Sequence, residues 1–396
     1  MPSGQMKNLL YKLALPIFAP SPEKDPVISV TGHPLDDRKS LARILRKHHV
    51  LGASVLLASH EDETLVLTRS LKTGQVPDEN TMYRVASITK TATAMVTLRL
   101  CAEGLISLDS PVSLYLPDCC SDIDLKDVTL RHLLSHTSGL SDPADLVRLL
   151  EEGAPFRQAV AGRRVAEPGK SFRYSNLGFG LVGCVLESVT GKAVSEVFYE
   201  YLFRPLGMNA TLEGCSLRKE TIMPVVRVFP YHADRMLRLT ELGKKPVGSP
   251  DPLRHYGYTA GSMYTDIRSL RKMIGCVMDG GRGLPGSETI RQMTCQHASY
   301  GAVSPALSYG LGLLIIQDPS ISAERVLGHQ GFAYGCADGA FWDEESGWIM
   351  IILNGGCSEA RDGRLGLCNR DMLRYAFGKE IPGWVISKQS EAYEIG

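Results

Sequence analysis

The chain has 396 residues, and its 43 Lys and Arg are balanced by 43 Asp and Glu, so its formal net charge is zero. A chain of this length buries a large core and forms one large domain or two intermingled ones. The balanced charge excludes the strongly basic surface that is typical of proteins binding nucleic acid or anionic membranes. We therefore expect neither kind of partner.

The N-terminal segment, residues 1–35, is rich in proline and is predicted to be irregular. Lys7 and the run LLYKLALPIFAP give it the outline of a short export signal. This run is interrupted by Lys12 and Pro16, is too short to span a bilayer and ends without a clear cleavage site. We expect a cytoplasmic protein without a stable membrane span, and export by this segment stays open as the alternative.

Three elements are predicted before residue 105. Residues 36–49, DDRKSLARILRKHH, have the periodicity of an amphipathic helix. Two strands joined at HEDE in a hairpin are predicted by the run GASVLLASHEDETLVLTRS. A long apolar helix then begins near Ser87 and ends near Gly104.

The middle of the chain, about 88–295, is dominated by helical patterns such as LGFGLVGCVLESVTG and DIRSLRKMIGCVMDGG. Strand patterns return in YGLGLLIIQ, YGCADGAFWDE and GWIMIILNGG, and RDGRLGLCNRDMLRYAFG predicts a closing helix. Strands near both ends with helices between them predict an α+β fold. Its antiparallel sheet comes from about 50–70 and 305–356 and is flanked by helices, with an inserted, mainly helical lobe. This domain is expected over 36–380, followed by a tail at 381–396.

Ser87 and Lys90 stand three residues apart at the start of the long helix. At that spacing the two side chains lie on one face of a helix, about 5–6 Å apart at Cβ. Ser87 could simply cap the helix, because a serine oxygen accepts an unpaired backbone N–H at a helix start. It could equally be a nucleophile that Lys90 activates, and this segment alone does not decide between the two.

Two further segments carry polar side chains at points where a site could form. FRYSNLGFG places Tyr174, Ser175 and Asn176 just before an apolar helix, where Ser175 or Asn176 could act only as a cap. VLGHQGFAYG places His329 between two glycines in a run of strand character, and glycine in a strand often marks the close approach of a ligand or backbone. A surface turn with an incidental histidine is the alternative.

The remaining histidines give no sign of a metal site. His132 and His136 have the spacing of a helical metal pair, but Leu133 stands where a zinc hydrolase would carry its glutamate, and no third ligand is nearby. We expect structural roles for both in a loop below the cleft. His48 and His49 fall on the polar side of the early helix and are expected to be solvated.

The ten cysteines show no C-x-x-C spacing, and several lie in apolar runs. They are interpreted as mostly free thiols in a reducing compartment. Neither a metal nor an organic cofactor is expected.

Taken together, SITK at 87–90, YSN at 174–176 and GHQG at 328–331 resemble the motifs of the serine β-lactamases and penicillin-binding-protein-like hydrolases. The likeness is to the branch of class C β-lactamases, D-aminopeptidases, DD-carboxypeptidases and related esterases. It extends over about residues 50–357, through stretches such as VTLRHLLSHTSGL and YTAGSMYTDIRSLRKM. The resemblance implies a β-lactamase/transpeptidase-like fold and catalysis through an acyl-enzyme.

The resemblance also implies a role for each motif residue. Ser87 would be the nucleophile, Lys90 its activating partner and Tyr174 the proton shuttle. Asn176 and His329 would line the substrate groove. The backbone N–H groups of Ser87 and of Phe332, the residue after Gly331, would form the oxyanion hole. Chemistry supports the assignment, since Lys90 could be desolvated inside its helix and a lysine acts as a base only when its pKa is lowered.

One departure from the family bears on the substrate. Many relatives carry lysine where this chain has His329, and histidine is mostly neutral above its reference pKa of about 6.5. Recognition of a β-lactam or D-Ala carboxylate is thereby put in doubt, so esters, amides and short D-residue peptides become equally plausible substrates. Acyl transfer to an acceptor other than water, or an inactive binding protein of this fold, are the alternatives. The oligomeric state is left open.

Overall fold

The computed structural model describes the chain in segments. These are residues 3–19, 25–32, 37–69, 74–116, 124–229, 246–281, 284, 286–333 and 335–378.

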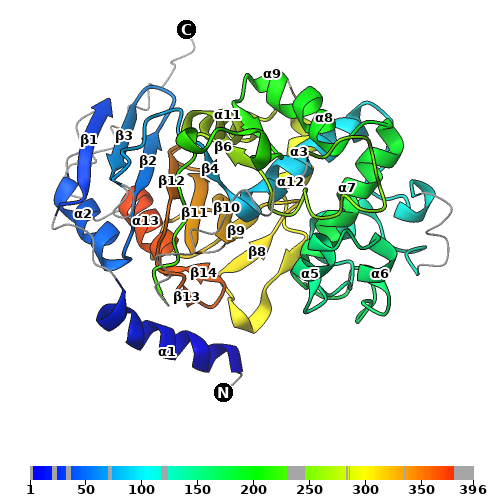
Figure 1. Ribbon diagram of the computed structural model, residues 1–396, viewed down its shortest axis with the longest axis horizontal. Coiled ribbons are helices and arrows are strands. Elements are labelled where there is room, and N and C mark those ends of the chain that lie inside the picture. Colours follow the sequence, from blue (N-terminus) through cyan, green and yellow to red (C-terminus); the bar gives the residue numbers. More distant parts are fainter. Residues whose placement is uncertain are drawn as a thin grey trace, which may run out of the picture.

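The described residues form a nine-stranded sheet, packed beside a lobe of helices (Figure 1). The strand order is β1-β3-β2-β12-β11-β10-β9-β8-β7, and every pairing in it is antiparallel. The strands are β1 (Val27–Gly32), β2 (Ala53–Ala58), β3 (Glu63–Thr68), β7 (Ala298–Ser299), β8 (Leu307–Tyr309), β9 (Leu314–Ile316), β10 (Val326–Ala333), β11 (Cys336–Asp343) and β12 (Ile349–Asn354). The predicted α+β class with an antiparallel sheet is confirmed, and β2 and β3 form the predicted hairpin.

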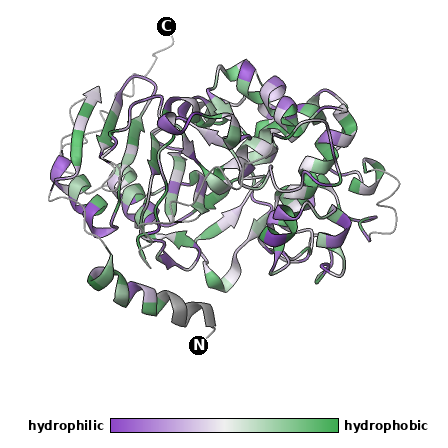
Figure 2. Ribbon diagram, viewed as in Figure 1, coloured by the Kyte–Doolittle hydropathy of each residue, from purple (hydrophilic) through white to green (hydrophobic). Residues whose placement is uncertain are grey.

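The central strands are buried on both faces, which explains their nearly continuous apolar sequences. On one face, Val55 and Ile352 pack in a core with the helices α2 (Arg38–Lys47) and α13 (Leu367–Phe377). On the other face, Leu56 and Ile351 join a second core, which includes α3 (Thr89–Ala102) and α11 (Ile267–Met278). Figure 2 shows these central strands mostly in the green of hydrophobic residues.

The lobe is built around α3, whose residues from Thr89 to Leu98 are all buried. A helix surrounded in this way carries threonines whose hydroxyls bond backbone carbonyls, as Thr93 does with Thr89 and Thr259. The other lobe helices are α4 (Leu130–Leu134), α5 (Leu146–Glu151), α6 (Phe156–Val160), α7 (Asn176–Thr190), α8 (Val194–Phe198), α9 (Arg204–Leu206) and α12 (Ser287–Thr294). The strand β4 (Tyr83–Arg84), which ends just before the turn that carries Ser87, forms a small sheet with β6 (Tyr264–Thr265) and β5 (Ala210–Thr211).

The expectation of an irregular segment at 1–35 is wrong for the residues described there. Helix α1 (Ser3–Phe18) buries Leu15 against Val226 and Val228, and β1 forms the edge of the sheet by pairing with β3. An edge strand of six residues held mainly by backbone hydrogen bonds needs no strong apolar pattern, so the surrounding prolines hid it.

No single described helix is long and apolar enough to cross a membrane. One pair, Asn176–Thr190 with Val194–Leu206, passes the same test of length and composition together, but it is bent by 87°.

Helix α2 confirms the predicted amphipathic helix, but the expected solvation of the histidines after it is wrong. His48 and His49 are 3% and 7% exposed. The His48 Nε2 atom lies 2.7 Å from a carboxylate oxygen of Asp371 on α13, which draws the ring into the contact between the two helices. A helical pattern ending at His48 cannot show this partner, which lies far along the chain.

Glycines divide two of the predicted C-terminal elements. The run YGLGLLIIQ forms two strands, β8 and β9, because Gly312 has a φ of +67° and turns the chain against α3. A Cβ at Gly312 would lie 2.5 Å from the carbonyl oxygen of Lys90, so only glycine fits this contact. The closing helix begins at Leu367, because the hairpin of β13 (Arg361–Asp362) and β14 (Leu365–Gly366) turns at Gly363, with a φ of +55°.

Candidate active site

Ser87 lies in a 3₁₀ turn, Ala86–Ile88, that leads directly into α3. Ala86 has a φ of +46°, a backbone conformation that is costly for any residue with a side chain. A hydrogen bond from the Thr89 hydroxyl to the Ala86 carbonyl, 2.6 Å long, holds this turn. On its outer side the turn meets β10, where a Cβ at Gly331 would lie 2.3 Å from the Val85 carbonyl oxygen. Gly331 is therefore required for the turn and the strand to meet.

The interpretation of Ser87 as a helix cap is wrong. The residue that caps α3 is Ile88, and it makes no side-chain capping bond. The Ser87 hydroxyl instead lies 3.2 Å from Nζ of Lys90.

Lys90 is fully buried, and its amine is surrounded by oxygen atoms. Its Nζ atom lies 2.6 Å from the carbonyl oxygen of Ala260 and 2.9 Å from Oδ1 of Asn176. Burial lowers the pKa of Lys90 to about 7; Arg84 adds to this effect, while Asp142 opposes it. The desolvation expected from the sequence is thus present.

This surrounding suits a neutral amine that acts as a base. A neutral lysine has two N–H donors and one lone pair, whereas the charged form has three donors and no lone pair. The oxygens of Ala260 and Asn176 can only accept, so they occupy the two N–H groups. The lone pair is then left for the Ser87 hydroxyl, which can donate its proton.

Tyr174 covers this pair on the side of a cavity that it lines. Its ring centroid lies 4.9 Å from Nζ of Lys90, and its hydroxyl bonds to Ser87. Burial raises the pKa of Tyr174 far above its usual value, and the hydrogen bond to Ser87 offsets this only in part. A phenol that stays protonated can donate to a departing group and recover a proton afterwards.

Asp142 is a site residue that no sequence motif indicated. Ser175 caps α7, and its hydroxyl donates to Asp142. The same carboxylate accepts from the backbone N–H groups of Asn176 and Leu177 and from Nδ2 of Asn176, at 2.9–3.0 Å. Because Nδ2 is held by Asp142, the amide of Asn176 must present Oδ1 to Lys90. The aspartate lies in a loop far from YSN, and only folding brings the two together.

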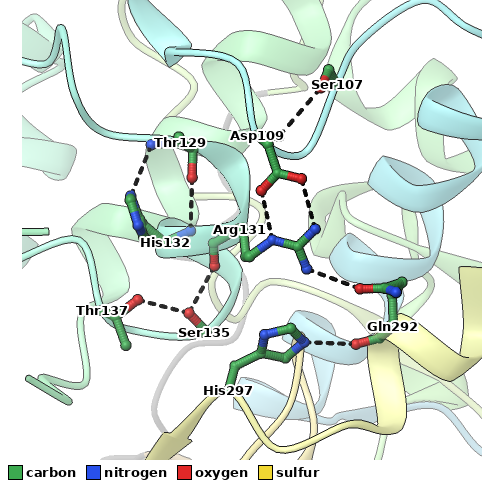
Figure 3. A network of polar contacts seen from close by, with 9 residues as sticks. All are labelled: Ser107, Asp109, Thr129, Arg131, His132, Ser135, Thr137, Gln292 and His297. Carbon is green, nitrogen blue, oxygen red and sulfur yellow. Dashed lines mark hydrogen bonds and ion pairs between the residues drawn. The ribbon is translucent and has the colours of Figure 1, made fainter. Parts of the chain in front are cut away.

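The two histidines of RHLLSH have separate structural roles. Nδ1 of His132 accepts from the backbone N–H of Thr129 at 3.3 Å, and the Thr129 hydroxyl caps α4 in return. Figure 3 shows this cap beside a network in which Arg131 binds Asp109 and Gln292, so that α4 is tied to α12.

His136 lies against Tyr174. Its ring centroid is 4.2 Å from that of Tyr174, and its Nδ1 accepts from the backbone N–H of Ser175 at 3.1 Å. Its carbonyl oxygen accepts from the backbone N–H of Arg173. Burial, together with Lys90 and His329, holds the pKa of His136 well below its usual value, so the ring is neutral. His136 therefore forms hydrogen bonds with the backbone on both sides of Tyr174.

His329 lies in the wall of the same site, but it does not have the expected titration near neutral pH. It is 2% exposed. Its Nδ1 donates to the Gln330 carbonyl at 2.7 Å, which leaves Nε2 to accept from the Tyr309 hydroxyl at 2.8 Å. Burial, reinforced by Lys90, lowers the pKa of His329 to about 3. The expectation rested on a solvated imidazole, whereas this ring is neutral at all ordinary pH values.

These residues surround a cavity of about 250 Å³. It is lined by Ser87, Tyr174, Asn176, Tyr300, Leu314, His329, Gln330, Phe332, Arg361 and Arg364. The structure thus brings together the predicted site residues, with Lys90 and Gly331 directly behind the lining. Sequence reasoning missed Tyr300, Arg361 and Arg364, which come from a loop before β8 and from the β13–β14 hairpin.

Within the described residues, no group of three or more His, Cys, Asp or Glu is placed to hold a metal ion. The eight described cysteines are free thiols, as predicted, while Cys119 and Cys120 lie outside the described residues.

Comparison with known proteins gives matches over most of the chain. The sequence model of the Beta-lactamase family matches residues 38–361. Esterase EstB of Burkholderia gladioli is 26% identical over an alignment length of 386, and the match covers 83% of this chain and 92% of EstB. A D-stereospecific amidohydrolase from Streptomyces sp. has a TM-score of 0.60 at 25% identity, covering 83% of this chain and 94% of its own. EstCE1, described as a hydrolase with promiscuous acyltransferase activity, has a TM-score of 0.66 at 20% identity, with coverage of 86% and 99%, and shows the same fold.

Proposed function

The chain belongs to the Beta-lactamase family, and from this premise we propose that it is a serine hydrolase whose nucleophile is Ser87. The reaction proceeds through an acyl-enzyme, and the substrate is an ester, an amide or a D-residue peptide. The similarity to an esterase and to a D-stereospecific amidohydrolase supports this range of substrates.

The contact between Lys90 and Ser87 carries the proposal. The Nζ–Oγ distance is 3.2 Å, and the other two neighbours of Nζ can only accept hydrogen bonds. With a pKa of about 7, a large share of the amine is neutral near pH 7, and this neutral form is able to take the serine proton.

Acylation uses these groups in sequence. Lys90 takes the proton of Ser87 while Oγ attacks the substrate carbonyl, and the negative charge moves to the carbonyl oxygen. We assign the backbone N–H groups of Ser87 and Phe332 to this oxyanion; one such donor is typically worth about 2.7–4 kcal/mol. As the tetrahedral intermediate collapses, Tyr174 gives its proton to the leaving group and recovers one from Lys90.

Deacylation reverses the same path with water in place of the leaving group. None of the residues that line the cavity is Asp or Glu. The proton of the attacking water therefore passes through Tyr174 to Lys90, and Ser87 is restored when the acyl group leaves as an acid.

Intact-protein mass spectrometry after treatment with a fluorophosphonate tests the nucleophile. We expect one adduct on the wild-type protein and none on Ser87→Ala, with the same far-ultraviolet circular dichroism for both. Incubation with 4-nitrophenyl esters and with D-amino-acid amides then shows which substrate class forms an acyl-enzyme. Labelling of Ser87→Ala at the wild-type rate would refute the assignment.

A further inference from the structure

Helix α1 lies at the edge of the molecule, and one of its faces packs against the body (Figure 1). Leu15 is 6% exposed and packs against Val226. The ring centroid of Tyr11 lies 5.6 Å from that of Phe229, and the Tyr11 hydroxyl accepts from the backbone N–H of Glu359 at 3.1 Å. Tyr11 and Leu15 are four residues apart, so they lie on the same side of the helix, which we call the inner face.

The opposite side of α1 presents aliphatic side chains to solvent. We call it the outer face and define it as Leu9, Leu10, Leu13 and Ile17, which are between 45% and 73% exposed. At about 3.6 residues per turn, these four positions fall within one stripe roughly 100° wide, on the side away from the inner face. Single exposed apolar residues are common on protein surfaces, whereas a contiguous group of them indicates a surface that binds a partner.

The charges on α1 distinguish between the partners that could cover the outer face. The helix contains Lys7 and Lys12, and it contains neither aspartate nor glutamate. Two copies of α1 packed outer face to outer face would bring lysines together without an acidic residue on either helix to pair with them. The surface of an anionic bilayer, in contrast, attracts nearby lysines.

The length of α1 suits a helix that lies on a bilayer rather than one that crosses it. Its sixteen residues extend about 24 Å at 1.5 Å per residue, which is less than the hydrocarbon core of about 30 Å. A helix at the bilayer surface needs one apolar face and basic residues beside it. The inner face of α1 can therefore stay packed on the body while the outer face meets lipid.

We infer that the outer face of α1 binds the surface of an anionic phospholipid bilayer, where its aliphatic side chains insert at the boundary between headgroups and acyl chains. The sequence predicted no membrane partner, because the zero net charge of the whole chain averages over a helix whose own charges are all positive. This inference does not depend on the proposed function of Ser87.

Flotation of the full chain with vesicles tests the inference. One set of vesicles consists of phosphatidylcholine alone, and the other of phosphatidylcholine mixed with phosphatidylglycerol, which is anionic. The protein is centrifuged with each set through a density gradient. The measured quantity is the partition coefficient between vesicles and solution.

Three variants separate the outer face from a general effect of charge. Leu13→Glu combined with Ile17→Glu places two carboxylates on the outer face, at exposed positions. Leu114→Glu combined with Val147→Glu is the matched control, because these apolar residues are also exposed but lie on other elements. Lys12→Gln removes one exposed positive charge and keeps the outer face intact. Thermal melting checks the folding of each variant.

We expect the wild type to float with the anionic vesicles and much less with the neutral ones. The outer-face variant should lose at least about 10-fold in its partition coefficient on the anionic vesicles, because it loses apolar contact and gains charge, while the control should bind like the wild type. Lys12→Gln should lower the partition coefficient about 5-fold on the anionic vesicles and leave it unchanged on the neutral ones.

A wild type that floats with neither set of vesicles would overturn the inference, and so would equal losses in the outer-face variant and its control. Light scattering after size-exclusion chromatography detects the other occupant. A wild-type dimer that does not float, and that becomes a monomer in the outer-face variant, would assign the outer face to a second copy of the chain. None of the substituted residues lines the cavity at Ser87, so fluorophosphonate labelling judges the proposed function separately.

Discussion

The floor and the rim of the cavity are built in different ways. The floor, defined as Ser87, Lys90, Tyr174, Asn176 and Asp142, is held by hydrogen bonds of 2.9–3.2 Å between α3, α7 and the loops beside them. The rim, defined as Tyr300, Gln330, Arg361 and Arg364, belongs to a loop, a sheet edge and a short hairpin. In the proposed function the floor performs the chemistry, and we expect the rim to influence which substrates reach it.

The largest effect is expected for Lys90→Met, which removes the base and keeps the volume of the side chain. We expect kcat to fall about 10³-fold for every ester, anionic or neutral, because proton transfer is needed whatever the substrate carries. Steady-state kinetics on 4-nitrophenyl pentanoate and on the mono-4-nitrophenyl ester of glutaric acid, which adds a carboxylate, measures this. A loss confined to one ester would break the distinction between floor and rim.

The same variant should be more stable than the wild type, and the gain should depend on pH. Burial lowers the pKa of Lys90 from its ordinary value of 10.5 to about 7, so between these values the unfolded chain binds a proton that the native protein does not. The stability of the wild type therefore rises with pH over this range. Thermal melting should show the advantage of Lys90→Met to be large at pH 7 and to shrink toward pH 10.

A smaller loss, about 10- to 100-fold in kcat, is expected for Asp142→Asn. The carboxylate accepts every bond it makes at the start of α7, and an amide nitrogen in its place would face donors. Asp142 also raises the pKa of Lys90, so its removal should move the acidic limb of the rate profile to lower pH. Asp145→Asn is the matched control, because Asp145 lies just after the same loop and pairs with exposed Arg148. An unmoved limb would show that Asp142 acts only on packing.

The smallest effect concerns His329. We expect its titration to leave the ratio of kcat/KM for the two esters unchanged. Because the pKa of His329 is about 3, its charge should not alter between about pH 5 and pH 8. The rate on both esters should rise together as Lys90 loses its proton near pH 7, leaving their kcat/KM ratio constant. A ratio that falls through pH 6–7 in the wild type and stays level in His329→Asn would show that this imidazole does become charged.

Four of the five floor residues could be predicted from the sequence, because local spacings indicate their chemistry. Ser87 and Lys90 are three residues apart, and Tyr174 and Asn176 lie in one turn. Asp142 could not be predicted, since a lone aspartate in a loop has the same appearance whether it faces water or four donors. His48 shows the same limit, because its partner Asp371 lies on a helix at the other end of the chain.

The rim could not be predicted for a related reason. Arg361 and Arg364 fall in a stretch whose periodicity favours a helix, and only the φ of Gly363 turns it into a hairpin. The neutral state of His329 depends on Tyr309 and on burial within the sheet, neither of which a motif of four residues contains. Substrate preference is therefore the property that sequence alone determined least.

The contact between the Ser87 turn and Gly331 has a consequence for biosynthesis. The turn is an early part of the chain, but β10, which supports it, is made after the whole helical lobe, and β2 completes its pairing only with β12. When α3 has left the ribosome, the nascent chain therefore contains Ser87 and Lys90 but not yet β10, the strand that supports their turn. Hydrolytic activity should therefore appear only after the last strands of the sheet emerge, and we expect partly synthesised chains to be inactive.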